Sequence, residues 1–465
     1  MPNPIAFMML AIWPLVAVAL FRKLPADRAV IITLLAGYLI LPEPPAVFDL
    51  PLMPPLNKHN VPAVAAFAIT LWMYGAKGSL LPHSAMGKVL VLTFVFSPIA
   101  TVLTNGEPVF YGQVGLPALG AKDAIALILQ QALMILPFLL GRQFLASGGA
   151  QRDMLVALVV GGLIYSLFML IEIRLSPQLN LWIYGYYQHY FGQSVRFGGY
   201  RPVVFLYHGL WVAFFTMTAV AAAFALWRSE TLSKTWKWLA AGLYLALILV
   251  LAKSLGALLL AFVVIPPIVL LSRTGQIKLA IVIGVAAIAY PILKGVDLVP
   301  QQWLLDQAAS IDPDRAASLD FRFTNENTLL ARAYEKAVFG WGNWGRNHIL
   351  DPVSGNILTV TDGRWIIVIG VYGWVGFLAE FGLLILPLIL LWRETSVAQD
   401  VRISPYIAPL SLILAINLAD MLPNATLTPL TWLLAGALVG YAEHLRALRL
   451  KHKSPVIGLR WQSIM

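Results

Sequence analysis

Residues 203–227 read VVFLYHGLWVAFFTMTAVAAAFALW, a stretch without Asp, Glu, Lys or Arg that is long enough to cross a bilayer as one helix. Similar apolar stretches of about 15 to 25 residues recur along the chain between short polar breaks. The 465 residues are 59% hydrophobic and only 12% charged, whereas soluble domains carry about 25% charged residues. This composition excludes a soluble enzyme, a disordered protein and a nucleic-acid-binding module. It predicts an all-α polytopic membrane protein.

The hydropathy pattern predicts about 12 to 13 transmembrane helices. A turn at Lys253-Ser254-Leu255-Gly256 separates two short spans, because one helix over 238–272 would reach roughly 52 Å. The predicted spans lie near 3–21, 28–41, 62–77, 86–104, 122–141, 153–173, 203–227, 238–252, 255–272, 278–294, 364–392, 403–422 and 428–445.

The positions of Lys and Arg predict the orientation of these spans. Of the 32 basic residues, 19 lie on one set of short loops and the tail, and the other 13 lie mostly in two long loops. The tail is therefore expected on the cytoplasmic side and the long loops outside. The predicted segments are N-terminal transmembrane helices over 1–173, a first outer site loop over 174–202, central transmembrane helices over 203–294, a large outer loop over 295–363, C-terminal transmembrane helices over 364–445 and a basic tail over 446–465.

The two long outer loops carry the unusual polar chemistry. The loop over 174–202 is rich in aromatic residues and contains Arg196 and Arg201. The loop over 295–363 has the pattern of amphipathic helices near 301–310 and 325–337. Arginine binds phosphate in a bidentate manner. An arginine cluster near the bilayer surface therefore predicts a site for a lipid-linked phosphate or diphosphate.

A third outer segment, 42–62, contains seven prolines, which exclude a continuous helix, and we expect an external loop there, either on the surface or re-entrant. Near the end of the large loop, Gly340, Gly342 and Gly345 alternate with Trp341 and Trp344. Without a preceding strand this is not a dinucleotide-binding pattern. It predicts a tight turn that presses on the membrane surface.

Two of these stretches resemble the bacterial O-antigen ligase and polymerase superfamily of integral membrane glycosyltransferases. The first is Arg196-Phe-Gly-Gly-Tyr-Arg201-Pro202 before a span, which is similar to an Arg-x-x-Gly stretch in the family. The second is Arg322-Phe-Thr-Asn-Glu326, followed by an amphipathic helix and then Phe339-Gly-Trp-Gly342. This order resembles the arginine, helix and glycine turn of the family's large periplasmic loop.

A third stretch resembles the family but departs from it at one position. The family has His-Asn followed by two glycines, eleven and fourteen positions after the His. Gly373 and Gly376 fit this spacing and point back to position 362, which is Asp. Asp362 thus stands where the family's proposed catalytic His stands. A second departure is Leu255, where the family often has Arg, although Lys253 can supply the charge.

The resemblance implies a metal-independent, helical C-class glycosyltransferase without a cofactor, multi-pass in the bacterial inner membrane, with its active face periplasmic. Its donor would be an undecaprenyl-diphosphate-linked glycan and its acceptor a second glycan, with export and chain-length proteins of surface polysaccharide (exopolysaccharide, lipopolysaccharide) biosynthesis as further partners. Asp362 is the first candidate base and Glu326 the second. The diphosphate would be bound by Arg196, Arg201 and Arg322, with Lys253, Arg346 and Arg364 as helpers.

Other hypotheses stay open at this point. A polymerase that inverts the anomeric centre is favoured, and a ligase acting on lipid A core or protein would use the same donor. A transporter would place ionisable residues deep in several spans, where only Glu380 lies; a non-catalytic subunit would tolerate Lys for Arg. Asp362 could also cap the next helix, and Arg322 could pair with Glu326. His208 is expected to be a hydrogen-bonded packing residue, and Asp312-Pro-Asp314 an ordinary turn.

Overall fold

The computed structural model describes residues 1–75, 79–196, 198–230, 235–397 and 403–453. The end of the predicted span 62–77 and residues 454–465 of the predicted tail lie outside these ranges. A helix lies in every predicted span, and seven of the helices are long and apolar enough to cross a membrane. The chain is therefore an all-α multi-pass membrane protein. These seven helices are α1 (Pro4–Lys23), α4 (Ala85–Leu103), α5 (Ala121–Phe144), α6 (Gly148–Leu175), α8 (Gly209–Ser229), α11 (Arg273–Gly295) and α14 (Arg364–Val397).

Shorter elements complete the bundle and its loops. Apolar helices in the remaining predicted spans are α2 (Ala26–Ile40), α3 (Val61–Tyr74), α9 (Trp236–Leu251), α10 (Leu255–Leu270), α15 (Ile407–Asp420) and α16 (Pro429–Lys453). The loops contain α7 (Leu179–Tyr184), a 3-10 turn (Phe191–Ser194), α12 (Gln301–Ile311), α13 (Pro313–Tyr334) and the hairpins β1 (Val109–Tyr111) with β2 (Val114–Leu116) and β3 (Val195–Arg196) with β4 (Gly199–Tyr200).

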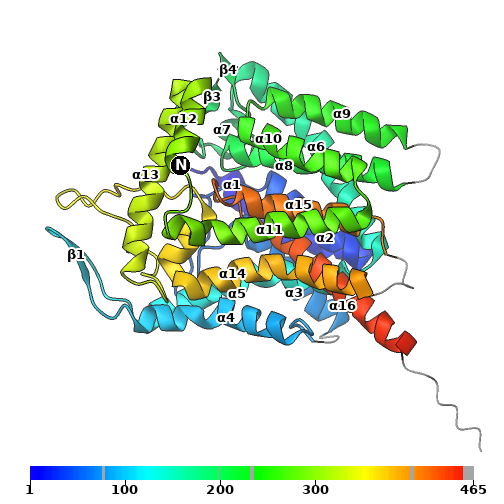
Figure 1. Cartoon of the computed structure of the whole chain (residues 1–465), viewed down its shortest axis with the longest axis horizontal. Helices are drawn as coiled ribbons and strands as arrows, with labels where there is room; N and C mark the ends of the chain where they lie inside the picture. The colour runs from blue at the N-terminus through cyan, green and yellow to red at the C-terminus, as the bar shows by residue number, and fades with distance from the viewer. Residues whose placement is uncertain (76–78, 197, 231–234, 398–402, 454–465) are drawn as a thin grey trace, which may run out of the picture.

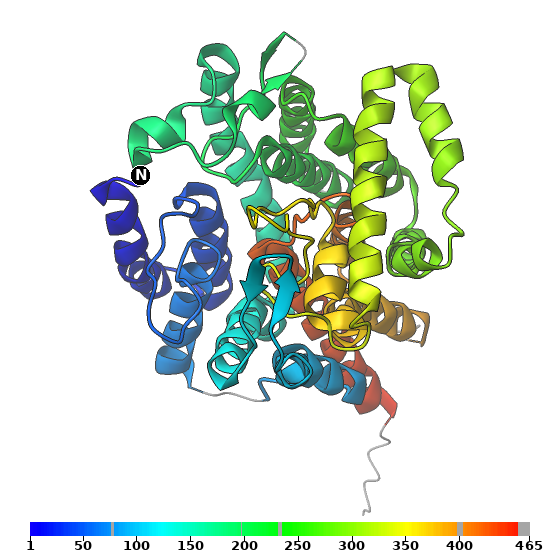
Figure 2. The same ribbon diagram turned by 90° about the vertical axis from the view of Figure 1, so that its left-hand side faces the viewer.

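Most of the bundle helices run side by side along the long axis of the molecule (Figure 1). The N-terminus, both β-hairpins, α12 and α13 lie at one end, and α16 ends at the other (Figure 1). We name these the hairpin end and the tail end. Figure 2 looks onto the hairpin end, where α12 and α13 form an antiparallel pair beside the β1–β2 hairpin. All loops in which the sequence predicts site residues meet at this end.

Some helices contact each other so closely that only glycine fits at the contact position. A Cβ atom at Gly141 of α5 would collide with the carbonyl oxygen of Leu433 in α16. A Cβ atom at Gly436 of α16 would collide in turn with the carbonyl oxygen of Phe138. Small residues of this kind let helix backbones approach closely where hydrophobic exclusion between helices is weak. Gly141 and Gly436 therefore allow α5 and α16 to pack in direct backbone contact.

Helix α13 starts earlier than the sequence predicts. The predicted amphipathic helix covers 325–337, whereas α13 runs over Pro313–Tyr334. Asp312, expected in an ordinary turn, is the N-cap, and its carboxylate accepts a hydrogen bond of 3.0 Å from the Asp314 N–H. Pro313 occupies the first helical position, where its fixed φ favours a helix start. The earlier start places Arg322 and Glu326 on a continuous helix.

The predicted span 364–392 is two helical segments and not one straight helix. Gly373 has φ 67° and ψ −169°, and the backbone reverses there against residues 337–339. In a straight helix Arg364 and Glu380 would lie about 24 Å apart. Their side chains are instead in contact at 2.7 Å, because the chain folds back on itself. The 24 residues after Gly373 remain long enough to cross a bilayer.

Candidate functional site

Three of the predicted phosphate-binding arginines converge at the hairpin end. Arg196 lies on β3, Arg201 follows β4, and Arg322 lies on α13, more than a hundred residues later. The charges of all three reach the imidazole of His208 and lower its pKa, although burial has the larger effect. We call Arg196, Arg201 and Arg322 the arginine cluster. It joins the two outer loops that the sequence analysis singled out.

The β3–β4 hairpin positions the first two arginines. The Arg201 N–H donates to the Ser194 carbonyl at 2.8 Å and closes the base of the hairpin. The stem of Arg201 passes over Gly209, where a Cβ atom would collide with the Arg201 side chain. Lys253, in the turn between α9 and α10, donates to the Arg196 carbonyl at 3.0 Å. Lys253 therefore ties the α9–α10 turn to the β3–β4 hairpin, at the residue that carries the first arginine of the cluster.

Arg201 is the most exceptional member of the cluster. Its side chain is buried, with 6% exposure, and its Nε has no hydrogen-bond partner. No carboxylate lies within ion-pair distance of it in the described part of the chain. Burial lowers the pKa of Arg201 to about 10, and the neighbouring charge of Arg196 acts in the same direction. A buried cation without a counter-charge is costly unless an anion binds to it.

His208 is the N-cap of α8, and the charges of the arginine cluster act on it. Its Nδ1 accepts a hydrogen bond of 3.1 Å from the Leu210 N–H, so Nδ1 carries no proton. Its Nε2 therefore carries the proton and donates to the Gln193 side-chain oxygen at 3.0 Å. The prediction of a hydrogen-bonded packing residue is confirmed. In addition, burial and then the nearby charges, Arg201 first, lower the pKa of His208 to about 3.

This lowered pKa predicts an acid-sensitive fold. Below pH 6.5 the unfolded chain binds a proton at His208 that the folded chain does not bind until the pH approaches 3. Stability therefore falls as the pH falls, by roughly 2 kcal/mol between pH 8 and pH 5. His208→Asn keeps an N-cap acceptor and removes this titration. Thermal unfolding in detergent at both pH values should show a smaller acid loss in this variant; an equal loss would contradict the assignment.

Asp362 contacts the arginine cluster. Its carboxylate lies 3.5 Å from Nε of Arg322, and both side chains are about one third exposed. Arg322 also donates to the Pro423 carbonyl at 2.8 Å, which ties α13 to the end of α15. Within the described chain, the Asp362 carboxylate accepts no capping hydrogen bond from the helix that follows it. The side chain remains accessible beside the Arg322 guanidinium.

Glu326, the second candidate base, faces away from this pair. Its Oε2 accepts a hydrogen bond of 2.9 Å from the Tyr290 hydroxyl and lies 3.4 Å from the Lys294 ammonium. The alternative of an ion pair with Arg322 is not observed, since Arg322 pairs with Asp362. Burial raises the pKa of Glu326, and the charge of Lys294 opposes this only in part. Glu326 joins α13 to α11.

Arg364 and Glu380 form a buried bidentate ion pair behind the site. Nε and Nη2 of Arg364 each donate to a carboxylate oxygen of Glu380 at 2.7 Å. Glu380 is fully buried and Arg364 is 16% exposed. The Arg364 N–H also bonds to the Met421 and Asn424 carbonyls at 2.9 and 3.2 Å. The positive charge of Arg364 is therefore balanced by the Glu380 carboxylate.

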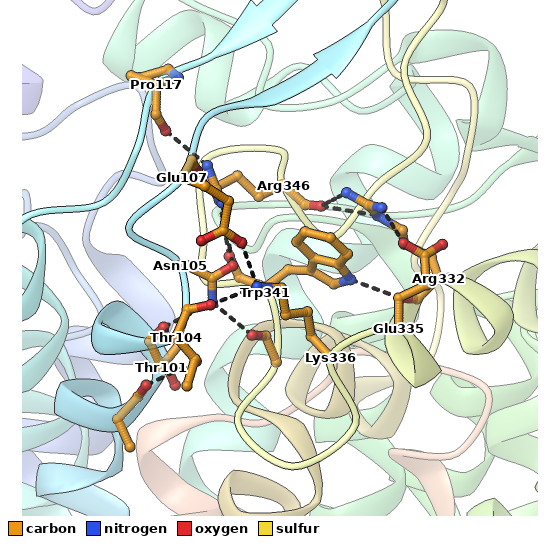
Figure 3. A network of polar contacts seen from close by, with 12 residues as sticks. Thr101, Thr104, Asn105, Glu107, Pro117, Arg332, Glu335, Lys336, Trp341 and Arg346 are labelled. Atoms are coloured by element: carbon orange, nitrogen blue, oxygen red, sulfur yellow. Dashed lines mark hydrogen bonds and ion pairs between the residues drawn. The ribbon is translucent and has the colours of Figure 1, made fainter.

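Arg346 lies apart from the arginine cluster, in a network that holds the glycine-rich turn (Figure 3). It is 1% exposed, and its guanidinium donates to the carbonyls of Pro117, Glu107 and Trp341 and to the Asn105 side chain at 2.8 to 3.2 Å. These bonds use four of the five guanidinium N–H donors within the protein, in a side chain that is almost fully buried. We therefore leave Arg346 out of the proposed site and assign it to the structure of the turn.

A second polar cluster, which was not predicted from the sequence, lies in the Pro-rich loop at the hairpin end. The Glu43 carboxylate lies 3.1 Å from the Lys58 ammonium and 2.9 Å from His59 Nε2. Glu43 and Lys58 are buried, whereas the His59 side chain is 39% exposed. Burial alone would raise the pKa of Glu43, but the charges of Lys58 and His59 outweigh it and hold the pKa at about 2. In the sequence, this cluster is indicated only by a Glu and a Lys that lie within a proline-rich loop.

Comparison with known proteins gives no matching family model and no curated protein of significant similarity. The site must therefore be interpreted from its own chemistry. Among the described residues, no group of three or more His, Asp or Glu side chains is placed to hold a metal ion. The arginine cluster offers cationic, bidentate donors for an anion such as a diphosphate, and Asp362 offers a carboxylate next to them. This pairing suits a reaction that expels an anionic leaving group.

Proposed function

We propose that this protein is a membrane glycosyltransferase that transfers a glycan from undecaprenyl diphosphate to a second glycan. The hairpin end would face the periplasm of a bacterial inner membrane. The observation that carries the proposal is the convergence of Arg196, Arg201 and Arg322, from two distant loops, with Asp362 in contact with Arg322. The resemblance of these stretches to O-antigen ligases and polymerases supports the same function.

In the proposed reaction, Asp362 accepts the proton of an acceptor hydroxyl as its oxygen attacks the anomeric carbon of the donor sugar. The bond from that carbon to the diphosphate oxygen breaks, and undecaprenyl diphosphate leaves with the electron pair. One displacement inverts the anomeric centre. Negative charge grows on the leaving diphosphate, so guanidinium groups already in position stabilise the transition state more than the ground state. The uncompensated charge of Arg201 is well suited to this role.

The alternatives receive less support. A transporter would need free ionisable groups deep in the bundle, and Glu380 is held by Arg364 in a bidentate ion pair. A ligase would use the same donor and the same arginines, and it differs in the acceptor. We favour a polymerase in surface polysaccharide biosynthesis, because the Asp in place of His marks a divergent branch of the resemblance.

The test is to delete the gene in its host and to restore it as wild type, Arg201→Ala, Arg201→Lys or Arg174→Ala. Arg174 is an exposed arginine at the end of α6 and is the matched control. We expect Arg201→Ala to lower glycan transfer by about 10²- to 10³-fold, as loss of one oxyanion-binding donor does. Arg201→Lys should recover only part, because lysine cannot bind bidentately, and Arg174→Ala should be normal.

The products separate the hypotheses. Single repeat units left on the lipid carrier after deletion identify a polymerase, whereas long chains that stay on the carrier identify a ligase. Unchanged glycans in every strain would refute the glycosyltransferase proposal and favour a transporter.

A further inference from the structure

Two adjoining cavities open at the hairpin end. The larger has a volume of about 870 Å³ and lies between the Pro-rich loop, the start of α5 and the glycine-rich turn. The smaller has a volume of about 400 Å³. His59 and Met134 line both cavities, so the two share a wall. Together they have room for several sugar rings.

The walls of the larger cavity combine polar side chains with one exposed indole. The carboxylic acid residue Asp49, the amide residue Gln130 and Trp344 line it. Carboxylates and amides bind hydroxyl groups by accepting and donating hydrogen bonds. An aromatic face packs against an apolar surface while the edge of the ligand remains polar. These are the two kinds of surface that a saccharide has.

The glycine-rich turn holds Trp344 at this wall in a fixed position. Trp344 has φ 58°, a left-handed conformation that is rare for a bulky residue, and 49% of it is exposed. Such a conformation persists only where the surroundings impose it. The surroundings here are the bonds of Arg346 and the Thr101 hydroxyl, which donates to the Phe339 carbonyl at 2.7 Å (Figure 3). The network thus presents an exposed tryptophan that contributes little to the core.

The smaller cavity adjoins this wall and lies between the Pro-rich loop, the start of α8 and the loop after α15. Tyr207, Arg364 and Ala425 line it. They are close neighbours in the chain of His208, Asp362 and Pro423, the last of which accepts the Arg322 hydrogen bond. At the junction, the Glu43 contact of 2.9 Å orients the half-exposed His59 ring. A ligand in the larger cavity can therefore extend into the smaller one, which Arg364 lines.

We propose that the joined cavities bind the acceptor saccharide, with Trp344 stacking on a sugar ring and Asp49 bonding to its hydroxyls. That the bound saccharide is the acceptor rests on the proposed function, whereas saccharide binding itself rests on the cavities alone. Trp344 is placed here as a binding residue, and His59 as a positioning residue at the entrance to the smaller cavity.

The experiment measures binding of saccharide fragments by isothermal titration calorimetry to the full chain in lipid nanodiscs. The probes are fragments of two to six sugars released by mild acid from the surface polysaccharide of the host. We expect Trp344→Ala to weaken binding at least tenfold, which is about 1.4 kcal/mol, and Trp344→Phe to keep most of it. Asp49→Asn should weaken binding several-fold. Trp303→Ala is the matched control, because Trp303 is exposed on α12 outside both cavities.

Absence of binding to the wild type, or wild-type binding by both Trp344→Ala and Asp49→Asn, overturns the proposal. If Trp344→Ala does not fold, Asp49→Asn decides, since Asp49 is exposed in a loop. Arg201→Ala should bind fragments normally while glycan transfer is lost. If the wild type binds fragments but Arg201→Ala transfers glycan at the normal rate, saccharide binding in the cavities is supported and the proposed function is refuted. If Arg201→Ala loses transfer but the wild type binds no fragments, the proposed function is supported and saccharide binding in the cavities is refuted.

Discussion

Asp362→Asn is expected to lower glycan transfer by about 10²- to 10⁴-fold, the range over which general bases contribute. Asparagine has nearly the shape of aspartate and cannot take the proton from an acceptor hydroxyl. The substitution should leave stability nearly unchanged, because the ion pair with Arg322 is about one third exposed and such pairs contribute at most about 1 kcal/mol. Chain length of lipid-linked glycans in the complemented deletion strain measures the loss.

Glu326→Gln gives the matched comparison for this prediction. Its carboxylate bonds to Tyr290 and Lys294 within the helix packing, away from the Asp362–Arg322 pair. We expect it to lower the unfolding temperature and to retain most of the transfer rate. If Glu326→Gln abolishes transfer in a folded protein while Asp362→Asn retains it, the two carboxylates exchange roles and Glu326 is the base.

Glu380→Ala is expected to destabilise the protein by about 3 to 5 kcal/mol, the usual effect of removing one partner of a buried ion pair. It leaves the Arg364 guanidinium without the two hydrogen bonds of 2.7 Å that balance its charge. Equilibrium unfolding of the purified protein in mixed micelles measures the difference. Glu335→Ala, which removes an exposed partner of Arg332 on α13, should change stability by less than about 1 kcal/mol.

The double variant Arg364→Met with Glu380→Leu tests the cause of this destabilisation. Replacing both charges by apolar side chains leaves no uncompensated charge, so the double variant should be more stable than Glu380→Ala alone. A double variant that is less stable than the single one would show that shape, and not charge, dominates at this position.

The helical positions were predictable because hydropathy is a local property of the sequence. Each predicted span contains a helix, yet the sequence did not indicate that the helix over 364–392 reverses. Apolar residues continue on both sides of Gly373, so the periodicity is uninterrupted and only a positive φ marks the turn. The start of α13 was missed for a different reason: Asp312-Pro313 is typical of both turns and helix starts.

The candidate site was only partly predictable, because its contacts join distant parts of the chain. The pattern around Arg196 and Arg201 was identifiable locally, and the structure brings Arg322 close enough for its charge to act on the same His208. Arg346 is also an arginine of the large outer loop, but three of its four hydrogen-bond partners, Asn105, Glu107 and Pro117, lie far away in the sequence. The pairing of Arg364 with Glu380 required the reversal at Gly373, which local reasoning could not supply.

The reversal at Gly373 also bears on which nucleophile the proposed enzyme would use. Because the chain folds back there, Arg364 lies level with Glu380, about seven residues or roughly 10 Å along the helix from the turn. Asp362, two residues before Arg364, is thereby held beside Arg322 with about one third of its side chain exposed. Water is the competing nucleophile in glycosyl transfer, and a partly exposed base meets less of it once a bound glycan covers it. Cover by the acceptor would therefore limit wasteful hydrolysis of the lipid-linked donor.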